Sequence, residues 1–334
     1  MRRNSGERYP VFCTILCGAL AGSVLVAVSE ARAADGYPSK PIRIVCPFPP
    51  GGGLDFVSRT LGEKLAERLG QPVVVDNRPG ASGSIGAGIV AKAAPDGYTV
   101  LLASSSTMAV NPALQRLSYQ AVIKDFTPVS LVSRVSYVLV VHPSVAAKSV
   151  AELIRLAKSQ PSRLNYASSG TGSASHLAME LFKNMAGVDL THIPYKGSSP
   201  AVIDLIGGQV QTGFNNLIPA LPHVKSGRLR ALGVSGPARS AAMPEVPTIA
   251  ESGLPGYEAL QWYGVLLPAR APRVIIDRLH QEIGAILRLP EVRERLTHEG
   301  GDVIGSTPGQ FASHIENEIA KWTKVVNAAN IRAN

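Results

Sequence analysis

Hydrophobic and polar positions along the chain repeat as strand-like runs followed by helix-like runs. In the first third of the chain the strand-like runs are 41–46, 73–75 and 98–103, and the helix-like runs are 56–69 and 84–93. Within 56–69, Val57, Leu61 and Leu65 lie four apart on one helical face, and Gly70 is placed to end the helix. Because strands that alternate with helices usually pair in parallel, this order predicts an α/β sheet.

A second unit of the same kind follows the apolar run 137–141. Its strand-like runs are 164–167, 210–214 and 229–234, and its helices are expected to begin near Ser149, Leu177 and Ser199. Ser149 and Glu152 have the spacing of a capping box at a helix start, and Gly187 marks a helix end. The middle of the chain therefore predicts a second α/β unit.

The C-terminal part is mainly helical. After the apolar run 263–267 come the helical patterns 272–289, 291–298 and 308–328. Too few strands remain there for an independent domain, so we expect the chain to cross into a second lobe near 135–141 and to return near 262–267. The expected division is 34–137 plus 264–334 for lobe one and 138–263 for lobe two, with two crossover strands and a cleft between the lobes.

The first residues have the pattern of a secretory signal. Three arginines among the first eight residues precede the uncharged apolar stretch 11–28, and Ala31-Arg32-Ala33 has the small-x-small form of a cleavage signal. The alternative is an uncleaved membrane anchor, but the stretch is at the short limit for spanning a bilayer and is rich in Gly, Ala and Ser. We therefore expect residues 1–33 to be a signal peptide and the chain to be exported.

Charge and composition narrow the classes of function. The sequence carries a formal net charge of +9, and loss of residues 1–33, with four arginines and two acidic residues, would leave about +7. This mild excess either helps to attract small anions or serves ordinary solubility. Aromatic residues do not cluster with basic residues, which argues against nucleic acid as a partner.

Cysteine and histidine spacing predicts no metal site, cofactor or disulfide. Cys13 and Cys17 lie within the expected signal, so Cys46 remains alone, as a small buried residue of a strand. The seven histidines show no H-E-x-x-H or other metal-ligand spacing.

The stretch PFPPGGGLD, from Pro47 to Asp55, places consecutive glycines between a strand-like run and a helix-like run. It lacks the G-K-[ST] of a P-loop and the spacing of G-x-G-x-x-G, so a nucleotide loop is disfavoured. A strand-to-helix turn still directs unpaired backbone N–H groups at an anion, and glycine lets that anion approach. The candidate ligand-binding residues in this stretch are Pro50, Gly51, Gly52, Gly53 and Asp55.

Two further loops rich in hydroxyl groups follow predicted strands. The segment 168–176 combines serines, glycines and a threonine, and one of its serines, Ser173 or Ser175, is expected to cap the following helix. The segment 104–107 lies after the third strand, where α/β sheets place ligands. The candidate ligand-binding residues in these loops are Ser104, Ser105, Thr107, Ser168, Ser169, Gly170, Thr171, Gly172, Ser173 and His176.

The same cleft could instead serve an exported serine hydrolase. Ser175 or Ser173 would be the nucleophile and the neighbouring His176 the base. No G-x-S-x-G elbow surrounds any serine, which makes binding without catalysis the preferred hypothesis.

Many ordered segments together resemble one known family, the Bug substrate-binding proteins of tripartite tricarboxylate transporters. The matching segments are YPSKPIRIVCPFPPGGGLDFVSR, GQPVVVDNRPGASGSIGA, APDGYTVLLASSST, LNYASSGTGSASHLAMELF, IPYKGSSPAVIDLIGGQVQ, LPHVKSGRLRALGVSG, VPTIAESGLPGYE and WYGVLLPA. They cover essentially the whole chain after the expected signal. The resemblance implies a type II-like periplasmic-binding-protein fold, with a ligand cleft between two α/β lobes.

The resemblance also implies a function and further contacts. Such a receptor resides in the periplasm, closes over a small di- or tricarboxylate or a related organic acid and delivers it to a membrane permease, or to a sensor protein. We expect it to act as a monomer. Tyr195 and Asn215 are implied as further ligand contacts. The amides in Phe214-Asn-Asn216, where family members often carry an acid, favour a plain carboxylate over an amino acid.

Overall fold

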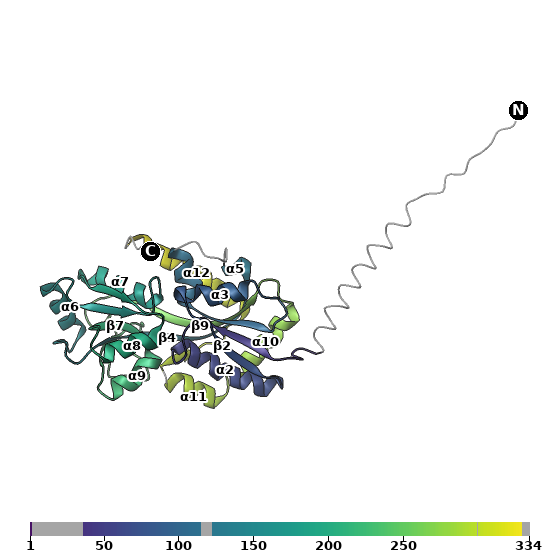
Figure 1. Ribbon diagram of the computed structural model, residues 1–334, viewed down its shortest axis with the longest axis horizontal. Coiled ribbons are helices and arrows are strands. Elements are labelled where there is room, and N and C mark those ends of the chain that lie inside the picture. Colours follow the sequence, from purple (N-terminus) through teal and green to yellow (C-terminus); the bar gives the residue numbers. More distant parts are fainter. Residues whose placement is uncertain (2–35, 115–121, 299, 329–334) are drawn as a thin grey trace.

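The computed structural model describes residues 1, 36–114, 122–298 and 300–328, and in these residues a mixed sheet of ten strands runs through the whole molecule (Figure 1). Its strands are β1 (Ile42–Cys46), β2 (Val73–Asn77), β3 (Thr99–Ser104), β4 (Phe126–Val141), β5 (Asn165–Ser168), β6 (Thr191–Pro194), β7 (Thr212–Asn216), β8 (Arg230–Val234), β9 (Leu260–Pro268) and β10 (Gly301–Val303). The main order is β2-β1-β3-β9-β4-β7-β5-β6, while β8 and β10 pair with β4. The expected α/β class is confirmed.

Helices cover both faces of this sheet (Figure 1). The α-helices are α2 (Gly53–Leu69), α3 (Ser84–Ala91), α4 (Asn111–Leu114), α5 (Val122–Asp125), α6 (Val150–Ser159), α7 (Ala174–Ala186), α8 (Ser198–Ile206), α9 (Leu217–Lys225), α10 (Arg273–Ile286), α11 (Pro290–His298) and α12 (Pro308–Ala328). Short turns of other helix types lie at Ala81–Gly83 and Ser106–Val110. Most of these elements lie where the hydrophobic pattern predicts them.

The long strand β4 joins the two lobes. Its first part, from Phe126 to Ser136, pairs with β9, and its last part, from Tyr137 to Val141, pairs with β7 and β8. The first lobe therefore holds β1, β2, β3, β9, β10 and the first part of β4. The second lobe holds β5 to β8 and the last part of β4.

The returning chain passes beside the point where β4 changes partners. Ser235 N donates to Tyr137 O (2.8 Å), Tyr137 N donates to Ser235 Oγ (2.8 Å), and Ala259 N donates to Ser235 O (2.9 Å). All of β9, from Leu260 onward, then lies in the first lobe beside β4, and from Tyr263 to Leu266 also beside β3. Ser235 thus ties both crossing segments together. The lobe limits expected from the sequence stay a prediction.

The C-terminal helices return to the first lobe. Helix α10 packs against α2 and β4, and α12 packs against β4 and the turn 106–110. Figure 1 shows these C-terminal elements on the same half of the molecule as α2 and β2. The last helices therefore pack on elements of the N-terminal half of the chain.

Alternate residues of the central strands pack on opposite faces of the sheet, as a pleated strand requires. Val45 and Leu101 belong to one buried apolar cluster, while Ile44 and Val100 belong to the other. The predicted stripe of α2 is confirmed, because Val57, Leu61 and Leu65 lie in the second cluster. Both clusters contain residues of both lobes.

Some elements were longer than the sequence suggested, and some were not expected. The strand expected at 137–141 begins at Phe126, and α2 begins at Gly53 rather than at residue 56. The strands β6 and β10 were not foreseen, since both are short and have no buried apolar run. The expected signal 1–33 lies, apart from Met1, outside the described residues, and no helix in the described part is long and apolar enough to cross a membrane.

Candidate functional site

A small cleft lies between the lobes where several strand-to-helix turns meet. The first lobe contributes the turn between β1 and α2, and the second contributes the ends of β5 and β7 and the start of α8. The residues lining the cleft are Phe48, Pro49, Gly52, Gly53, Leu54, Ser169, Ser198, Asn216 and Gln261. The cleft therefore brings together the two loops that the sequence singled out.

The glycine loop presents bare backbone to this cleft. Gly52 precedes the first turn of α2 with extended backbone, and Gly51 has φ +78°, which favours glycine. A Cβ on Gly53 would lie 2.5 Å from the Tyr263 hydroxyl, so only glycine fits there. The first N–H groups of a helix have no partner within it. At Gly53 and Leu54, which line the cleft, the start of α2 can therefore receive an anion.

Asp55 stabilises the loop from behind. Its carboxylate accepts hydrogen bonds from Gly51 N (3.0 Å), Asn77 Nδ2 (2.9 Å) and Arg59 Nε (3.0 Å). Burial by itself would raise the pKa of Asp55, but the hydrogen bonds from Arg59, Gly51 and Asn77 outweigh it and lower the pKa. Pro50 is exposed at the rim of the cleft. These partners assign Asp55 to positioning of the loop.

The serine-glycine loop contributes Ser169 to the cleft. Ser173 caps α7 by accepting a hydrogen bond from His176 N (3.2 Å). It is one of the two serines, Ser173 and Ser175, that were expected as the cap. His176 Nδ1 accepts from Gly172 N (3.1 Å), so this histidine supports the loop from inside. Ser168 is buried, and its Oγ lies 2.6 Å from His192 Nε2.

A neighbouring cavity of about 270 Å³ continues from the cleft and shares Phe48 and Ser169 with it. It is lined by the segments 80–83, 169–171 and 194–196. Gly170, Thr171 and Tyr195 of the predicted site lie here, although the Tyr195 hydroxyl donates to Asp204 Oδ2 (2.7 Å). Lys196, whose side chain is cationic and exposed, also lines this cavity.

The hydroxyl cluster after β3 lies behind the cleft wall. Ser104 and Thr107 are buried and 3.3 Å apart, and the Ser105 hydroxyl donates to Gln261 Oε1. Ser106, which belongs to the predicted segment 104–107, accepts a hydrogen bond from Ala174 N in the other lobe (2.9 Å). These residues therefore connect elements around the cleft and do not line it.

Several lining residues were missed by sequence reasoning. Asn216 lines the cleft and donates to Ser198 Oγ (3.2 Å), whereas the predicted Asn215 is its neighbour on the opposite face of β7. The helix start predicted near Ser199 could have indicated that Ser198 lines the site. Gln261 lies on an ordinary strand, and no local pattern marks it. The buried Asn216 Oδ1 and Tyr263 hydroxyl have no partner in the described structure.

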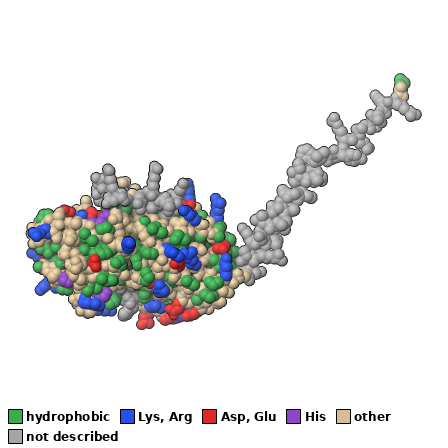
Figure 2. All heavy atoms as spheres, in the orientation of Figure 1, with side chains coloured by type: hydrophobic (Ala, Val, Ile, Leu, Met, Phe, Trp, Pro, Cys, Tyr) green, Lys and Arg blue, Asp and Glu red, His purple; other side chains and the backbone are tan. Residues whose placement is uncertain are grey.

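The cleft is suited to an anion although none of its described lining residues is charged. The N-termini of α2 and α8 both reach it, and each carries a partial positive charge of about half a unit. Ser169, Ser198, Asn216 and Gln261 add side-chain hydroxyl and amide groups. On the face seen in Figure 2, Lys and Arg side chains are scattered and form no single patch.

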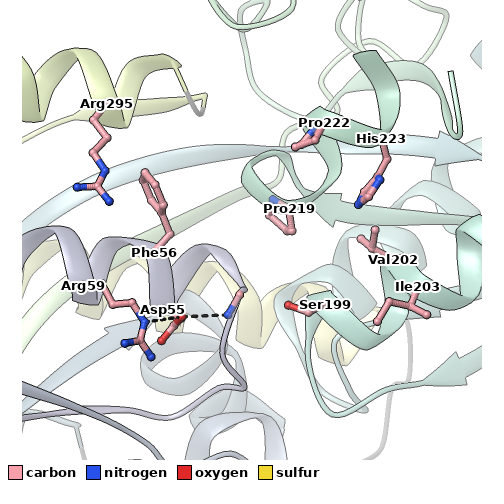
Figure 3. Close-up of a pocket in the computed structure, with 11 residues that line it drawn as sticks. Asp55, Phe56, Arg59, Ser199, Val202, Ile203, Pro219, Pro222, His223 and Arg295 are labelled. Atoms are coloured by element: carbon pink, nitrogen blue, oxygen red, sulfur yellow. Dashed lines mark hydrogen bonds and ion pairs between the residues drawn. The ribbon is translucent and has the colours of Figure 1, made fainter. Parts of the chain in front are cut away.

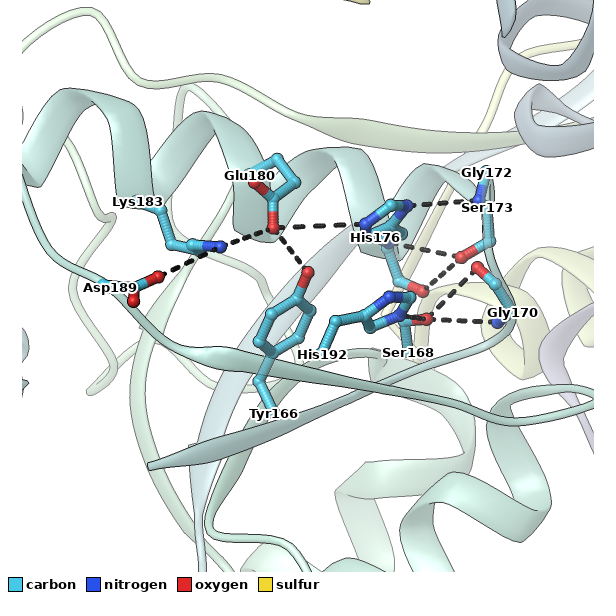
Figure 4. A network of polar contacts seen from close by, with 11 residues as sticks. Tyr166, Ser168, Gly170, Gly172, Ser173, His176, Glu180, Lys183, Asp189 and His192 are labelled. Carbon is cyan, nitrogen blue, oxygen red and sulfur yellow. Dashed lines mark hydrogen bonds and ion pairs between the residues drawn. The ribbon is translucent and has the colours of Figure 1, made fainter. Parts of the chain in front are cut away.

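The serine and histidine groups are not arranged for hydrolysis. Ser175 Oγ accepts from Ser169 N (3.0 Å), while His176 is bound to Gly172 N and lies 4.0 Å from Glu180 (Figure 4). Ser168 and His192 do contact each other, but burial lowers the pKa of His192 to about 3. A base with so low a pKa is poorly matched to proton abstraction near neutral pH.

The described residues contain no cluster of His, Cys, Asp or Glu that could hold a metal ion. Cys46 is buried, with burial raising the pKa of its thiol to about 11, and within the part of the chain that is described it is a free cysteine.

Comparison with known proteins places this chain in a family. The model of the tripartite tricarboxylate transporter family receptor matches residues 57–331. Among solved structures, Rpa4515 of R. palustris with adipate is 38% identical with a TM-score of 0.86, covering 89% of this chain and 99% of the other. The periplasmic binding protein BugD is 31% identical with a TM-score of 0.85, covering 89% of this chain and 100% of BugD.

A third solved structure, MatC from Rhodopseudomonas palustris with bound malate, is 33% identical with a TM-score of 0.83, covering 87% of this chain and 100% of MatC. The fold of the chain is thus the two-lobed periplasmic-binding-protein fold, as the resemblance implied. The chain belongs to the tripartite tricarboxylate transporter receptor family, the family of the Bug solute-binding proteins.

Proposed function

We propose that this protein captures a small di- or tricarboxylate, or a related organic acid, between its lobes and delivers it to a membrane permease without catalysis. The observation that carries the proposal is the cleft itself. It joins the start of α2 and the start of α8 with Ser169, Asn216 and Gln261, and none of its described lining residues carries a negative charge. Such a lining is complementary to a carboxylate.

The expected binding energy is sufficient without an arginine. A helix terminus contributes about 0.3–1 kcal/mol when exposed and up to ~2 kcal/mol when partly buried. Hydrogen bonds to a charged group contribute about 1.5–3 kcal/mol each. Micromolar affinity requires roughly 8 kcal/mol. Two helix termini and several hydrogen bonds from both lobes reach this value.

Two hydrogen bonds join the lobes beside the cleft. Ser199 Oγ donates to Pro50 O (3.3 Å), and Ser82 Oγ donates to Thr171 O (2.7 Å). A ligand that touches both lobes binds this arrangement better than an open one, so it shifts the population toward closure. A permease that recognises the closed form then receives only loaded receptor.

The known relatives support the ligand class and the compartment. Two of the solved relatives, Rpa4515 and MatC, contain adipate and malate, which are both dicarboxylates. For this chain the signal-like start and the periplasmic relative BugD support export to the periplasm. The cavity beside the cleft, with Lys196, offers room and charge for a second carboxylate.

The test is binding without turnover. Native mass spectrometry of the freshly purified protein should show a co-purified organic acid, and calorimetry should show saturable 1:1 binding of at least one of succinate, malate, adipate and citrate. The neutral diol 1,4-butanediol is the matched control and should not bind. If no acid binds, or if the bound acid is chemically converted, the proposal is wrong.

A further inference from the structure

A second and larger cavity lies between the lobes, on the side of α2, α8, α9 and α11 (Figure 3). We call it the outer groove and define it by Phe56 and Arg59 on α2, Ile203 on α8, Pro219 on α9 and Arg295 on α11. Its volume is about 450 Å³, within the roughly 300–1,000 Å³ that is usual for small-molecule sites. The cleft described above does not include these residues.

The outer groove is separated from the cleft by a narrow contact. Ser199 Oγ donates to Pro50 O (3.3 Å), and a Cβ on Gly51 would meet Ser199 Oγ at 3.6 Å. Gly51 and Ser199 line the groove, while Gly52 and Ser198 line the cleft. The two spaces therefore lie on opposite sides of this contact and can be occupied at the same time.

The walls of the outer groove are mostly apolar. Phe56 lies on one side, and Val202 and Ile203 face it from the other lobe, as Figure 3 shows. Ile203 is 66% exposed. Pro219 and Pro222 complete the wall. An occupant with an apolar body would remove this surface from water, and burial of apolar surface stabilises a complex.

The polar groups at one side of the groove are mainly cationic. The Arg295 guanidinium lies 5.3 Å from the centroid of the Phe56 ring, and it donates only its Nη1 to Glu63 (3.2 Å). Arg59 donates Nε to Asp55 and Nη2 to Asn77. A guanidinium has five N–H donors, so both arginines keep donors for another acceptor.

Each arginine of the groove has one carboxylate partner, so its charge is paired while part of its N–H donors stay unused. Arg59 pairs with Asp55 (3.0 Å) and Arg295 with Glu63 (3.2 Å), and Asp55 is the one acidic residue among the described residues that line the groove. That carboxylate is buried and already accepts hydrogen bonds from Gly51, Asn77 and Arg59. His223 also lines the groove, and its buried Nδ1 has no partner in the described structure. The unused guanidinium donors favour an occupant that brings a carboxylate as acceptor.

We propose that the outer groove is a second ligand site, which takes a monocarboxylate with an apolar body. The carboxylate binds the free N–H groups of Arg59 and Arg295, and the apolar body lies between Phe56 and Ile203. Because the walls come from both lobes, this ligand also favours closure. By linkage it tightens binding in the cleft, and the cleft ligand tightens binding in the groove by the same factor. The coupling between groove and cleft rests on the proposed carboxylate-receptor function, whereas the groove site itself does not.

The site is tested with hexanoate and benzoate as probes and with hexanol and benzyl alcohol as neutral matched controls. Calorimetry on the purified full chain should show saturable 1:1 binding of at least one acid, and the corresponding alcohol should bind at least tenfold more weakly. Absence of binding by both acids, or equal binding of acid and alcohol, would overturn the proposal.

Variants then locate the probe. Arg295→Gln and Ile203→Gln should each weaken binding of the acid, by about tenfold or more for Arg295→Gln and about three- to tenfold for Ile203→Gln. Val74→Gln is the matched control, because Val74 is also a highly exposed apolar residue (55%) but lies on the edge strand β2. The Val74→Gln protein should bind the acid with the same affinity as the unchanged protein. Unchanged affinity in both groove variants would place the probe elsewhere and refute the site.

A competition experiment separates this inference from the proposed function. With hexanoate at saturation, the dissociation constant of the dicarboxylate that binds the cleft should fall, by about threefold or more, and Ile203→Gln should remove this effect. Mutual exclusion of the two ligands would refute a second site. If no dicarboxylate binds but hexanoate shows the expected variant pattern, the cleft function fails and the groove site stands.

Discussion

The hydroxyl of Ser105 donates a hydrogen bond to Oε1 of Gln261, and this bond determines which end of the Gln261 amide is available to a ligand. The Tyr137 hydroxyl donates to the same oxygen (2.9 Å). With Oε1 held by two hydroxyl groups, Nε2 is the end left for the cleft, which Gln261 lines. This residue, close to the crossing strands, therefore supplies the cleft with a donor of fixed orientation.

Gln261→Glu should weaken carboxylate binding by about 100-fold. The new carboxylate can still accept from Ser105 and Tyr137, but it removes the Nε2 donor and adds a negative charge, which together cost a few kcal/mol. Calorimetry with the best dicarboxylate measures the effect. Gln211→Glu is the control, since Gln211 accepts from Asn165 N (3.0 Å) and is not one of the residues that line the cleft. Equal affinities in the two variants would show that Gln261 does not contact the ligand.

Gly53→Ala should destabilise the protein and weaken ligand binding. Its methyl group would lie 2.5 Å from the Tyr263 hydroxyl, and such overpacking typically costs about 1–3 kcal/mol. Thermal unfolding and calorimetry measure both effects. Tyr263→Phe in the same chain should restore part of the lost stability, because it removes the atom that clashes. Gly309→Ala is the control, since no atom lies within 4 Å of a Cβ there. A Gly53→Ala protein with unchanged stability and affinity would contradict the close packing.

Ser235→Ala should lower the free energy of unfolding by about 1–3 kcal/mol, the cost of leaving buried polar groups unpaired. The Ser235 hydroxyl accepts from Tyr137 N (2.8 Å) and donates to Ala259 O, and the residue is fully buried. Urea unfolding measures the loss. Ser144→Ala is the comparison, because its hydroxyl bonds only the nearby His142 at the surface. A loss no larger than that of Ser144→Ala would mean that Ser235 does not hold the crossing segments.

Acid should destabilise the second lobe through His176 and His192. The two rings stack 4.0 Å apart (Figure 4), and burial lowers the pKa of His176 to about 4 and that of His192 to about 3. The unfolded chain therefore binds protons below about pH 6.5 that the folded chain does not, so stability is present above that pH and is lost as the pH falls toward the folded values.

The expected loss between pH 7 and pH 5 is at most about 2 kcal/mol for each histidine. Urea unfolding at the two pH values measures it. His192→Gln should reduce the difference between the two pH values, while His142→Gln, outside this cluster, should leave it unchanged. An identical pH dependence in the His192→Gln protein would contradict the assignment.

The sequence predicted most of the framework because the framework depends on local periodicity. The stripe of Val57, Leu61 and Leu65 and the glycine at position 70 predict the end of α2 correctly, while its start lies at Gly53 rather than at residue 56. The first part of β4 was missed, since polar residues such as Ser130 and Ser133 interrupt its apolar pattern and are buried only by tertiary packing. Strand length here is set by the neighbours in the sheet.

The candidate site was predictable where backbone chemistry marks it. Consecutive glycines and serines at strand ends indicated the loops at Gly52 and Ser169, which both reach the cleft. Gln261 was not predictable, because its role depends on Ser105 and Tyr137, which lie 156 and 124 residues away in the sequence. The choice between Asn215 and Asn216 depends on which face of β7 meets the cleft. Two adjacent asparagines in the sequence do not indicate which face that is.

The continuous strand β4 has a consequence for how the receptor moves. The strand runs without interruption through Ser136 and Tyr137, where its partner changes from β9 to β7 and β8, and both apolar clusters contain residues of both lobes. Opening therefore has to bend and twist a hydrogen-bonded ribbon whose two ends are anchored in shared packing. The amplitude of the opening is limited by the elasticity of this ribbon, and the lobes depend on each other for their folding.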